Sequence, residues 1–121
     1  MHHAAKAYGA IAQKTANPRE READLLLDAA ARLQAIRDGW EAKQPELNAA
    51  LLNNRILWSI FMSSVTNPDN PLPAQVRQNV ANLGLFVLKQ TLTVMANPKP
   101  ENLGSLININ RELAAGLLGR A

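Results

Sequence analysis

With 121 residues, 47% hydrophobic side chains and a formal net charge of +3, the chain is typical of one globular domain and unlike a disordered tail. The absence of cysteine excludes disulfides, thiolate catalysis and thiol-based metal sites. No apolar run approaches the roughly 18 residues of a membrane span, and the first residues lack a signal peptide's apolar core, so we expect a cytoplasmic protein without membrane insertion.

Prolines divide the chain into segments whose apolar residues recur at helical spacing, and no segment alternates like a strand. The predicted fold is therefore all-α. We expect a small single-domain bundle over residues 1–121, with about five helices joined by proline-containing turns. The expected helices cover approximately residues 4–16, 18–38, 46–66, 72–96 and 101–118.

The second expected helix has clear start and stop signals. Asn17 can cap its first turn, Pro18 suits the first helical position, and Glu20 can reach back to the cap. Gly39 is expected to end it. The preceding helix, residues 4–16, is so short that it needs packing against other elements to be stable.

The third expected helix carries the densest apolar stripe, and it includes one asparagine, Asn54. Such a stripe needs neighbours on several sides, so we expect it to form the core. The helix should end near Thr66, because the proline-rich residues 67–71 cannot continue it. The apolar members of this stripe are Leu51, Trp58, Phe61 and Val65.

The fourth expected helix is apolar on more than one side. Only Arg77 and Lys89 are charged between Val76 and Met95. A helix of this kind lies either at the centre of its bundle or at an interface. For Leu85, Phe86 and Leu88 the sequence leaves core and partner contact equally open.

Few residues could carry chemistry. His2 and His3 have no carboxylate at metal-ligand spacing, and the chain has neither a glycine-rich phosphate loop nor a histidine or cysteine placed to activate a serine. The acidic residues between Glu20 and Asp28 fit a solvated helix face. We therefore predict a protein that is not an enzyme and has no cofactor and no metal site.

Asn54 and Asn110 begin the same pattern, Asn-Arg-x-Leu, on different helices beside apolar stripes. A buried amide must find hydrogen-bond partners. We favour an internal role in which these amides fix the bundle, for example by holding the proline-rich turn. Direct contact with a partner is the other interpretation, and the same two interpretations apply to Trp58 and Phe61.

Several short motifs in a fixed order give the chain a resemblance to a known family. They are Ala7-Tyr8, Asn17-Pro18-Arg19-Glu20, Asn54-Arg55-Ile56-Leu57-Trp58 with Phe61, Asn70-Pro71-Leu72-Pro73, Asn82-Leu83-Gly84 and Ile109-Asn110-Arg111-Glu112 followed by Gly116-Leu117. In this order and spacing the chain resembles the FlaF family of bacterial flagellar proteins, which are described as regulators of flagellin synthesis and as flagellin secretion chaperones. Ile56 departs from the family pattern, which has a second basic residue there.

The resemblance implies a non-enzymatic protein that binds the terminal helices of flagellin, with another flagellar regulator or an export component as a further partner. An apolar groove made by the third to fifth helices could receive an amphipathic flagellin helix. The expected partner-binding residues are Val76, Val80, Leu85, Phe86, Leu88, Lys89, Leu92, Ile107, Arg111, Leu113 and Leu117. Residues expected to shape the fold are Asn17, Pro18, Asn54, Arg55, Trp58, Phe61, Pro71, Leu72, Pro73 and Asn110.

Two alternatives stay open. The net positive charge and the family's description as regulators motivate direct binding of flagellin mRNA, but the basic residues are scattered and aromatic residues make up only 4% of the chain, which leaves few stacking platforms for RNA. The other alternative is a structural subunit that forms a homodimer through the fourth helix.

Overall fold

The computed structural model describes residues 17–120, in which every regular element is helical. The elements are α2 (Pro18–Asp38), the short α3 (Trp40–Lys43), a 3₁₀ turn η1 (Gln44–Glu46), α4 (Leu47–Thr66), α5 (Ala74–Ala96), a second 3₁₀ turn η2 (Pro100–Leu103) and α6 (Gly104–Leu117). The predicted all-α class is confirmed. The helix expected over residues 4–16 lies outside the described residues.

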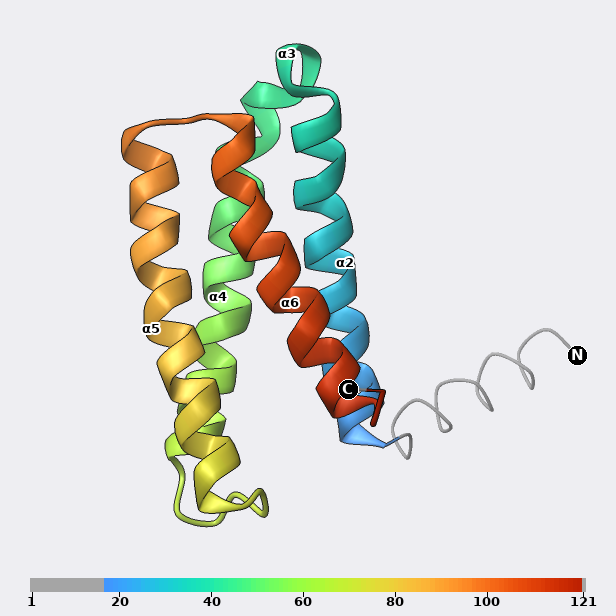
Figure 1. Cartoon of the computed structure of the whole chain (residues 1–121), viewed down its shortest axis with the longest axis vertical. Helices are drawn as coiled ribbons and strands as arrows, with labels where there is room; N and C mark the ends of the chain where they lie inside the picture. The colour runs from blue at the N-terminus through green and yellow to red at the C-terminus, as the bar shows by residue number, and fades with distance from the viewer. Residues whose placement is uncertain (1–16, 121) are drawn as a thin grey trace, which may run out of the picture.

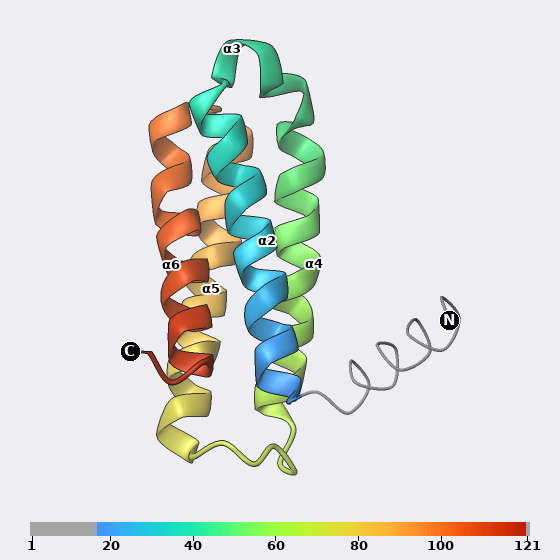
Figure 2. The ribbon, with the colours of Figure 1, turned by 90° about the vertical axis from the view of Figure 1, so that its right-hand side faces the viewer.

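The long helices α2, α4, α5 and α6 run alternately up and down one axis (Figures 1 and 2). α6 packs mainly on α2, α2 also packs on α4, and α5 packs mainly on α4. α5 and α6 touch each other little, and Figure 1 shows α6 crossing obliquely away from α5 towards the start of α2. α5 and α6 are therefore only loosely packed against each other.

The helix boundaries follow from local hydrogen bonds. At the start of α2, the side chain of Asn17 accepts a bond of 3.0 Å from the Arg19 backbone N–H, as the cap was predicted to do. In the turn after α4, the Asn70 amide donates to the backbone oxygen and the hydroxyl of Ser64, both at 3.1 Å. Asn70 also accepts from the Leu72 N–H at 2.9 Å, so Leu72 stays in the turn and α5 begins at Ala74.

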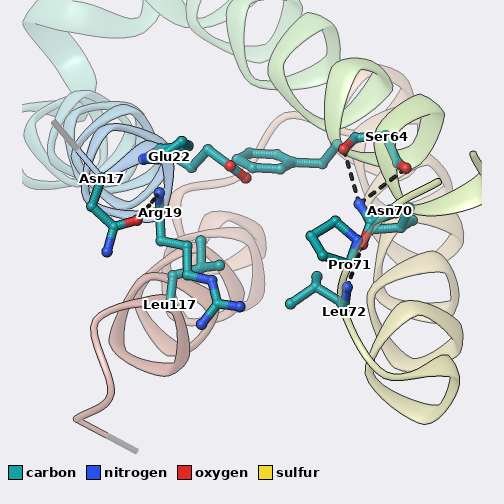
Figure 3. Close-up of a pocket in the computed structure, with 11 residues that line it drawn as sticks. Asn17, Arg19, Glu22, Ser64, Asn70, Pro71, Leu72 and Leu117 are labelled. Atoms are coloured by element: carbon teal, nitrogen blue, oxygen red, sulfur yellow. Dashed lines mark hydrogen bonds between the residues drawn. The ribbon is translucent and has the colours of Figure 1, made fainter. Parts of the chain in front are cut away.

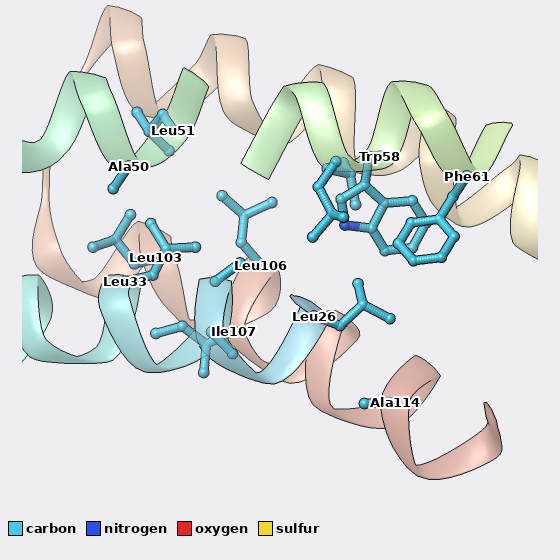
Figure 4. Packing of buried hydrophobic residues seen from close by; sticks show 14 of the residues in the cluster. Leu26, Leu33, Ala50, Leu51, Trp58, Phe61, Leu103, Leu106, Ile107 and Ala114 are labelled. Atoms are coloured by element: carbon cyan, nitrogen blue, oxygen red, sulfur yellow. The ribbon is translucent and has the colours of Figure 1, made fainter. Parts of the chain in front are cut away.

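The core is built from the inner faces of α2, α4, α5 and α6 (Figure 4). The apolar stripe predicted for α4 is buried, and the rings of Trp58 and Phe61 meet edge to face with centroids 6.0 Å apart. Facing residues from the other elements complete it. They include Leu26 and Leu33 of α2 and Leu103, Leu106, Ile107 and Ala114 at the C-terminal end of the chain.

One polar network lies inside this apolar core. Asn110 of α6 is fully buried, and its oxygen accepts a hydrogen bond of 2.9 Å from the Trp58 indole N–H. Its amide nitrogen donates to the Asn54 side-chain oxygen at 2.7 Å and to the Leu26 backbone oxygen at 3.4 Å. Asn110 thus joins α6 to both α4 and α2. The proline-rich turn, which Asn54 or Asn110 was expected to hold, is held by Asn70 instead.

Replacing Asn110 with alanine should lower the free energy of unfolding by about 2–3 kcal/mol, because the buried Trp58 N–H and Asn54 oxygen would lose their partner. Urea unfolding followed by circular dichroism measures this change. Asn108→Ala is the matched control, since Asn108 lies on the same helix and is exposed, and it should change stability by less than about 0.5 kcal/mol. Equal effects of the two substitutions would refute the role given to the network.

Gly84 is buried where α5 meets α4, and a Cβ built on it would lie 2.5 Å from the Met62 sulfur. Alanine in a helix interior is usually more stable than glycine by about 1 kcal/mol. We expect Gly84→Ala alone to show no such gain in stability. In the Met62→Ala background, where the space is open, Gly84→Ala should show the gain. Gly116→Ala should be stabilising by up to about 1 kcal/mol, because its Cβ would meet nothing within 4 Å. A Gly84→Ala protein as stable as Gly116→Ala would contradict the close approach.

Candidate binding groove

A pocket of about 380 Å³ opens where the start of α2, the turn after α4 and the end of α6 come together (Figure 3). Its apolar lining includes Phe61 and Val65 of α4 and, on opposite sides of the opening, Leu72 and Leu117. The remaining lining residues are Asn17, Pro18, Arg19, Glu22, Ser64, Asn70 and Pro71. The pocket therefore has an apolar interior and a mostly polar rim.

A second, shallower hollow lies between α5 and α6. It is lined by Asn79, Asn82, Leu83 and Phe86 of α5 and by Ile109 of α6. Along α6, Leu113 lies one helical turn from Ile109 and one turn from Leu117, so it stands between the two hollows. On α5, Val76 stands between the turn at Leu72 and the residues of the second hollow.

We call this surface the α5–α6 groove. Its apolar residues are Leu72, Val76, Leu83, Phe86, Ile109, Leu113 and Leu117. Val76 is 40% and Phe86 is 44% exposed, and the other members are half-buried. Apolar side chains left partly open along two facing helices mark a surface that can receive a ligand or a partner.

The predicted partner-binding residues do not form one surface. Four of them belong to the α5–α6 groove: Phe86 and Leu117 line its two hollows, and helical spacing places Val76 and Leu113 between these hollows. The others are on different surfaces, because each residue along a helix turns the side chain by about 100°.

Leu85, Leu88, Lys89 and Leu92 lie on the remainder of α5, with Leu85 54% and Leu92 61% exposed. Val80 and Ile107 are buried in the core, where a partner cannot reach them while the bundle is closed. They are core residues because they lie on the inner faces of α5 and α6.

Arg111 is exposed on the α2 side of α6, where its guanidinium donates to the Gln34 side-chain oxygen at 3.2 Å. It therefore lies away from α5. Sequence reasoning did not assign Leu83 or Ile109 to a binding surface. The spacing of Ile109, Leu113 and Leu117, one helical turn each, was the available signal for Ile109.

Glu22 is the acidic residue of the pocket lining. Partial burial raises the pKa of its carboxyl group above the ordinary value, and the positive charge of Arg19 opposes this rise. Figure 3 shows the Glu22 side chain extending towards the interior of the pocket. The pocket thus disfavours a negative charge at this position.

The described part of the chain has neither a cluster of metal ligands nor a helix suited to crossing a membrane. Within residues 17–120 no three histidine, aspartate or glutamate side chains gather as metal ligands. None of the helices in that range is both long enough and apolar enough to cross a membrane.

A family model described as Flagellar protein FlaF matches residues 4–117. The chain belongs to the FlaF family. The match confirms the resemblance found in the sequence motifs, and it includes every residue of the α5–α6 groove. Neither the curated proteins nor the solved structures contain a match to this FlaF-family chain.

Replacing Glu22 with glutamine should stabilise the protein near pH 7. A carboxyl whose pKa is raised on folding costs stability once the pH exceeds its unfolded value of about 4.3, because the folded state then favours the protonated form. The gain should shrink as the pH falls and vanish when both states are protonated. Urea unfolding across pH 3–8 measures it.

Asp28→Asn is the matched control, because Asp28 is exposed in the middle of the same helix. It should change stability by less than about 0.5 kcal/mol. A Glu22→Gln gain that stays constant down to pH 3 would contradict the assigned cause.

Proposed function

We propose that this chain is a non-enzymatic, cytoplasmic flagellin-binding protein that acts as a secretion chaperone and as a regulator of flagellin synthesis. In this proposal the α5–α6 groove receives an amphipathic helix from a flagellin terminus. Membership of a flagellar protein family supports the cellular role. The observation that carries the binding mode is the pair of apolar, partly open stripes on the facing sides of α5 and α6.

The dimensions of the groove suit a helix. Ile109 to Leu117 extend over about 12 Å of α6, and Val76 to Phe86 over about 15 Å of α5, at about 1.5 Å per residue. An amphipathic helix presents anchors at positions i, i+3, i+4 and i+7 over a similar length. The polar side chains along the edge, such as Asn79 and Asn82, can bond to the polar flanks of the bound helix.

A chaperone role follows from which surface is covered. The terminal helices of flagellin pair with one another in the filament, as the family resemblance implies. A helix held in the groove has its apolar face buried and cannot pair with another subunit. Flagellin bound in this way would stay unpolymerised until export, and the fraction of occupied grooves would reflect how much flagellin awaits export. We propose that the protein regulates flagellin synthesis according to this occupied fraction.

RNA is the alternative partner, and the groove is poorly suited to it. Of the residues that line the two hollows, only Arg19 is basic, and Glu22 lies in the same pocket. Binding to RNA phosphates depends on several basic side chains and weakens steeply with salt. The lining of the groove is therefore more compatible with an amphipathic helix than with a nucleic-acid backbone.

Phe86→Asp and Leu113→Asp should each weaken flagellin binding by at least about thirtyfold, as expected for a buried anchor residue. Size-exclusion co-elution with purified flagellin and isothermal titration calorimetry measure the loss. Circular dichroism should show an unchanged fold. Leu92→Asp is the matched control: Leu92 is also an exposed leucine of α5, it lies outside the groove, and its variant should bind flagellin normally.

Two results would contradict the proposal. One is normal co-elution of the folded Phe86→Asp and Leu113→Asp variants. The other is retention of flagellin leader RNA at low salt with a steep loss at higher salt, without any binding of flagellin, which would favour the RNA alternative.

A further inference from the structure

A second apolar stripe runs along α5, outside the groove. Ala81, Leu85, Leu88, Leu92 and Met95 follow one another at intervals of four, three, four and three residues. This is the spacing by which one helix packs along another in a coiled coil. Leu85 is 54%, Leu92 is 61% and Met95 is 50% exposed, so the stripe lacks a complete covering. We call these five residues the α5 seam.

The α5 seam and the α5–α6 groove are on opposite flanks of α5. The buried residues of α5, such as Val80, Gly84 and Val87, form the stripe between them. At about 100° per residue, the seam and the groove stripe are centred about 180° apart around the helix. The seam is on the α4 side, where Gly84 faces Met62 and Ala81 shares a hollow with Val65. A helix bound to the seam would therefore leave the groove free.

Exposed apolar side chains are concentrated on α4 and α5. Among residues 17–120, only Leu25 and Leu27 of the large exposed hydrophobic side chains lie outside α4 and α5. α4 adds Leu52 at 49%, Ile56 at 52% and Ile60 at 62% exposed. An exposed apolar area of this kind marks an interaction surface.

The charges of α4 and α5 are all of one sign. Arg55, Arg77 and Lys89 are their charged residues, and neither helix contains aspartate or glutamate. Arg55 and Lys89 are exposed, and Lys89 immediately follows Leu88 of the seam. An exposed cation beside an apolar stripe, with no acidic residue on either helix, is complementary to a helix whose own apolar stripe is flanked by acidic residues.

The α5 seam of a second copy of this chain does not have acidic residues beside its apolar stripe. Two α5 helices packed together would bring Lys89 of each copy to the same interface without any acidic residue of α5 to pair with it. A lipid surface does not require the regular four-three spacing either, and three cations on two helices are few for binding an anionic membrane. The spacing and the charges together favour a partner helix.

We propose that the α5 seam binds an amphipathic helix of a second protein, with apolar residues at heptad spacing and aspartate or glutamate on both flanks. This site is separate from the flagellin groove and does not depend on it.

A synthetic peptide of about three heptads, with leucine at the core positions and glutamate at the flanking positions, is the direct probe. It is used with the full chain, at concentrations where sedimentation shows the peptide to be monomeric. A matched peptide has lysine in place of every glutamate. Fluorescence anisotropy of the labelled peptides measures binding, and we expect the glutamate peptide to bind at least about tenfold more tightly.

Variants of the chain locate the site. Leu85→Asp and Leu92→Asp should each weaken binding of the glutamate peptide by at least about tenfold. Lys89→Glu, an exposed and structurally mild change, should weaken it and reverse the preference between the two peptides. Phe86→Asp, in the groove, should bind the peptide normally.

Several outcomes would overturn the inference. Equal binding of the two peptides would remove the charge argument, and undiminished binding by Leu92→Asp and Lys89→Glu would place the peptide elsewhere. A dimer of the unmodified chain that Leu92→Asp converts to a monomer would assign the seam to a second copy. Binding to anionic phosphatidylserine vesicles, lost in Leu92→Asp and without peptide binding, would assign it to a lipid surface. Flagellin co-elution of Leu92→Asp tests the groove separately.

Discussion

Asn110 is the residue on which the arrangement of the helices depends. Its buried amide connects α6 to the Trp58 indole and the Asn54 side chain of α4 and to the backbone of α2, three helices that otherwise pack mainly through apolar contacts. Apolar packing alone tolerates rotation and sliding of a helix, because it has little directionality. Buried hydrogen bonds do not, since a shift of one residue would turn the amide away by about 100° and leave the Trp58 N–H without a partner.

This fixed orientation of α6 creates the groove. With Asn110 pointing inwards, Ile109 lies on the flank towards α5 and Leu117 lines the pocket opposite Leu72, whereas Arg111 lies on the flank towards α2 and bonds to Gln34. α6 therefore packs closely on α2, is joined to α4 by the Asn110 hydrogen bonds, and has little contact with α5. α5 is supported chiefly by α4, where Gly84 permits close contact with Met62.

The fold was largely predictable because its signals are local. Proline, asparagine and glycine residues mark most helix ends, and the boundaries predicted for the four long helices lie within about three residues of those observed. The core stripe of α4 was equally clear. Helical periodicity on α5, however, gives several apolar stripes and does not show which one meets a neighbour. Val80 and Leu85 look alike in sequence, yet one is buried and the other is 54% exposed. The partners of Asn54 and Asn110, 56 positions apart in the chain, could not be read from local spacing either.

The position of α5 also determines how its two surfaces relate. The groove and the seam share no side chain, so each can be occupied while the other is free. Both are nevertheless parts of one helix, which rests mainly on α4 and has little contact with α6. A partner that pushed α5 away from α6 would carry the seam with it, because the residues of both stripes are attached to the same rigid backbone. Coupling between the two surfaces would therefore act chiefly through the contact of α5 with α4, which includes the close approach of Gly84 to Met62.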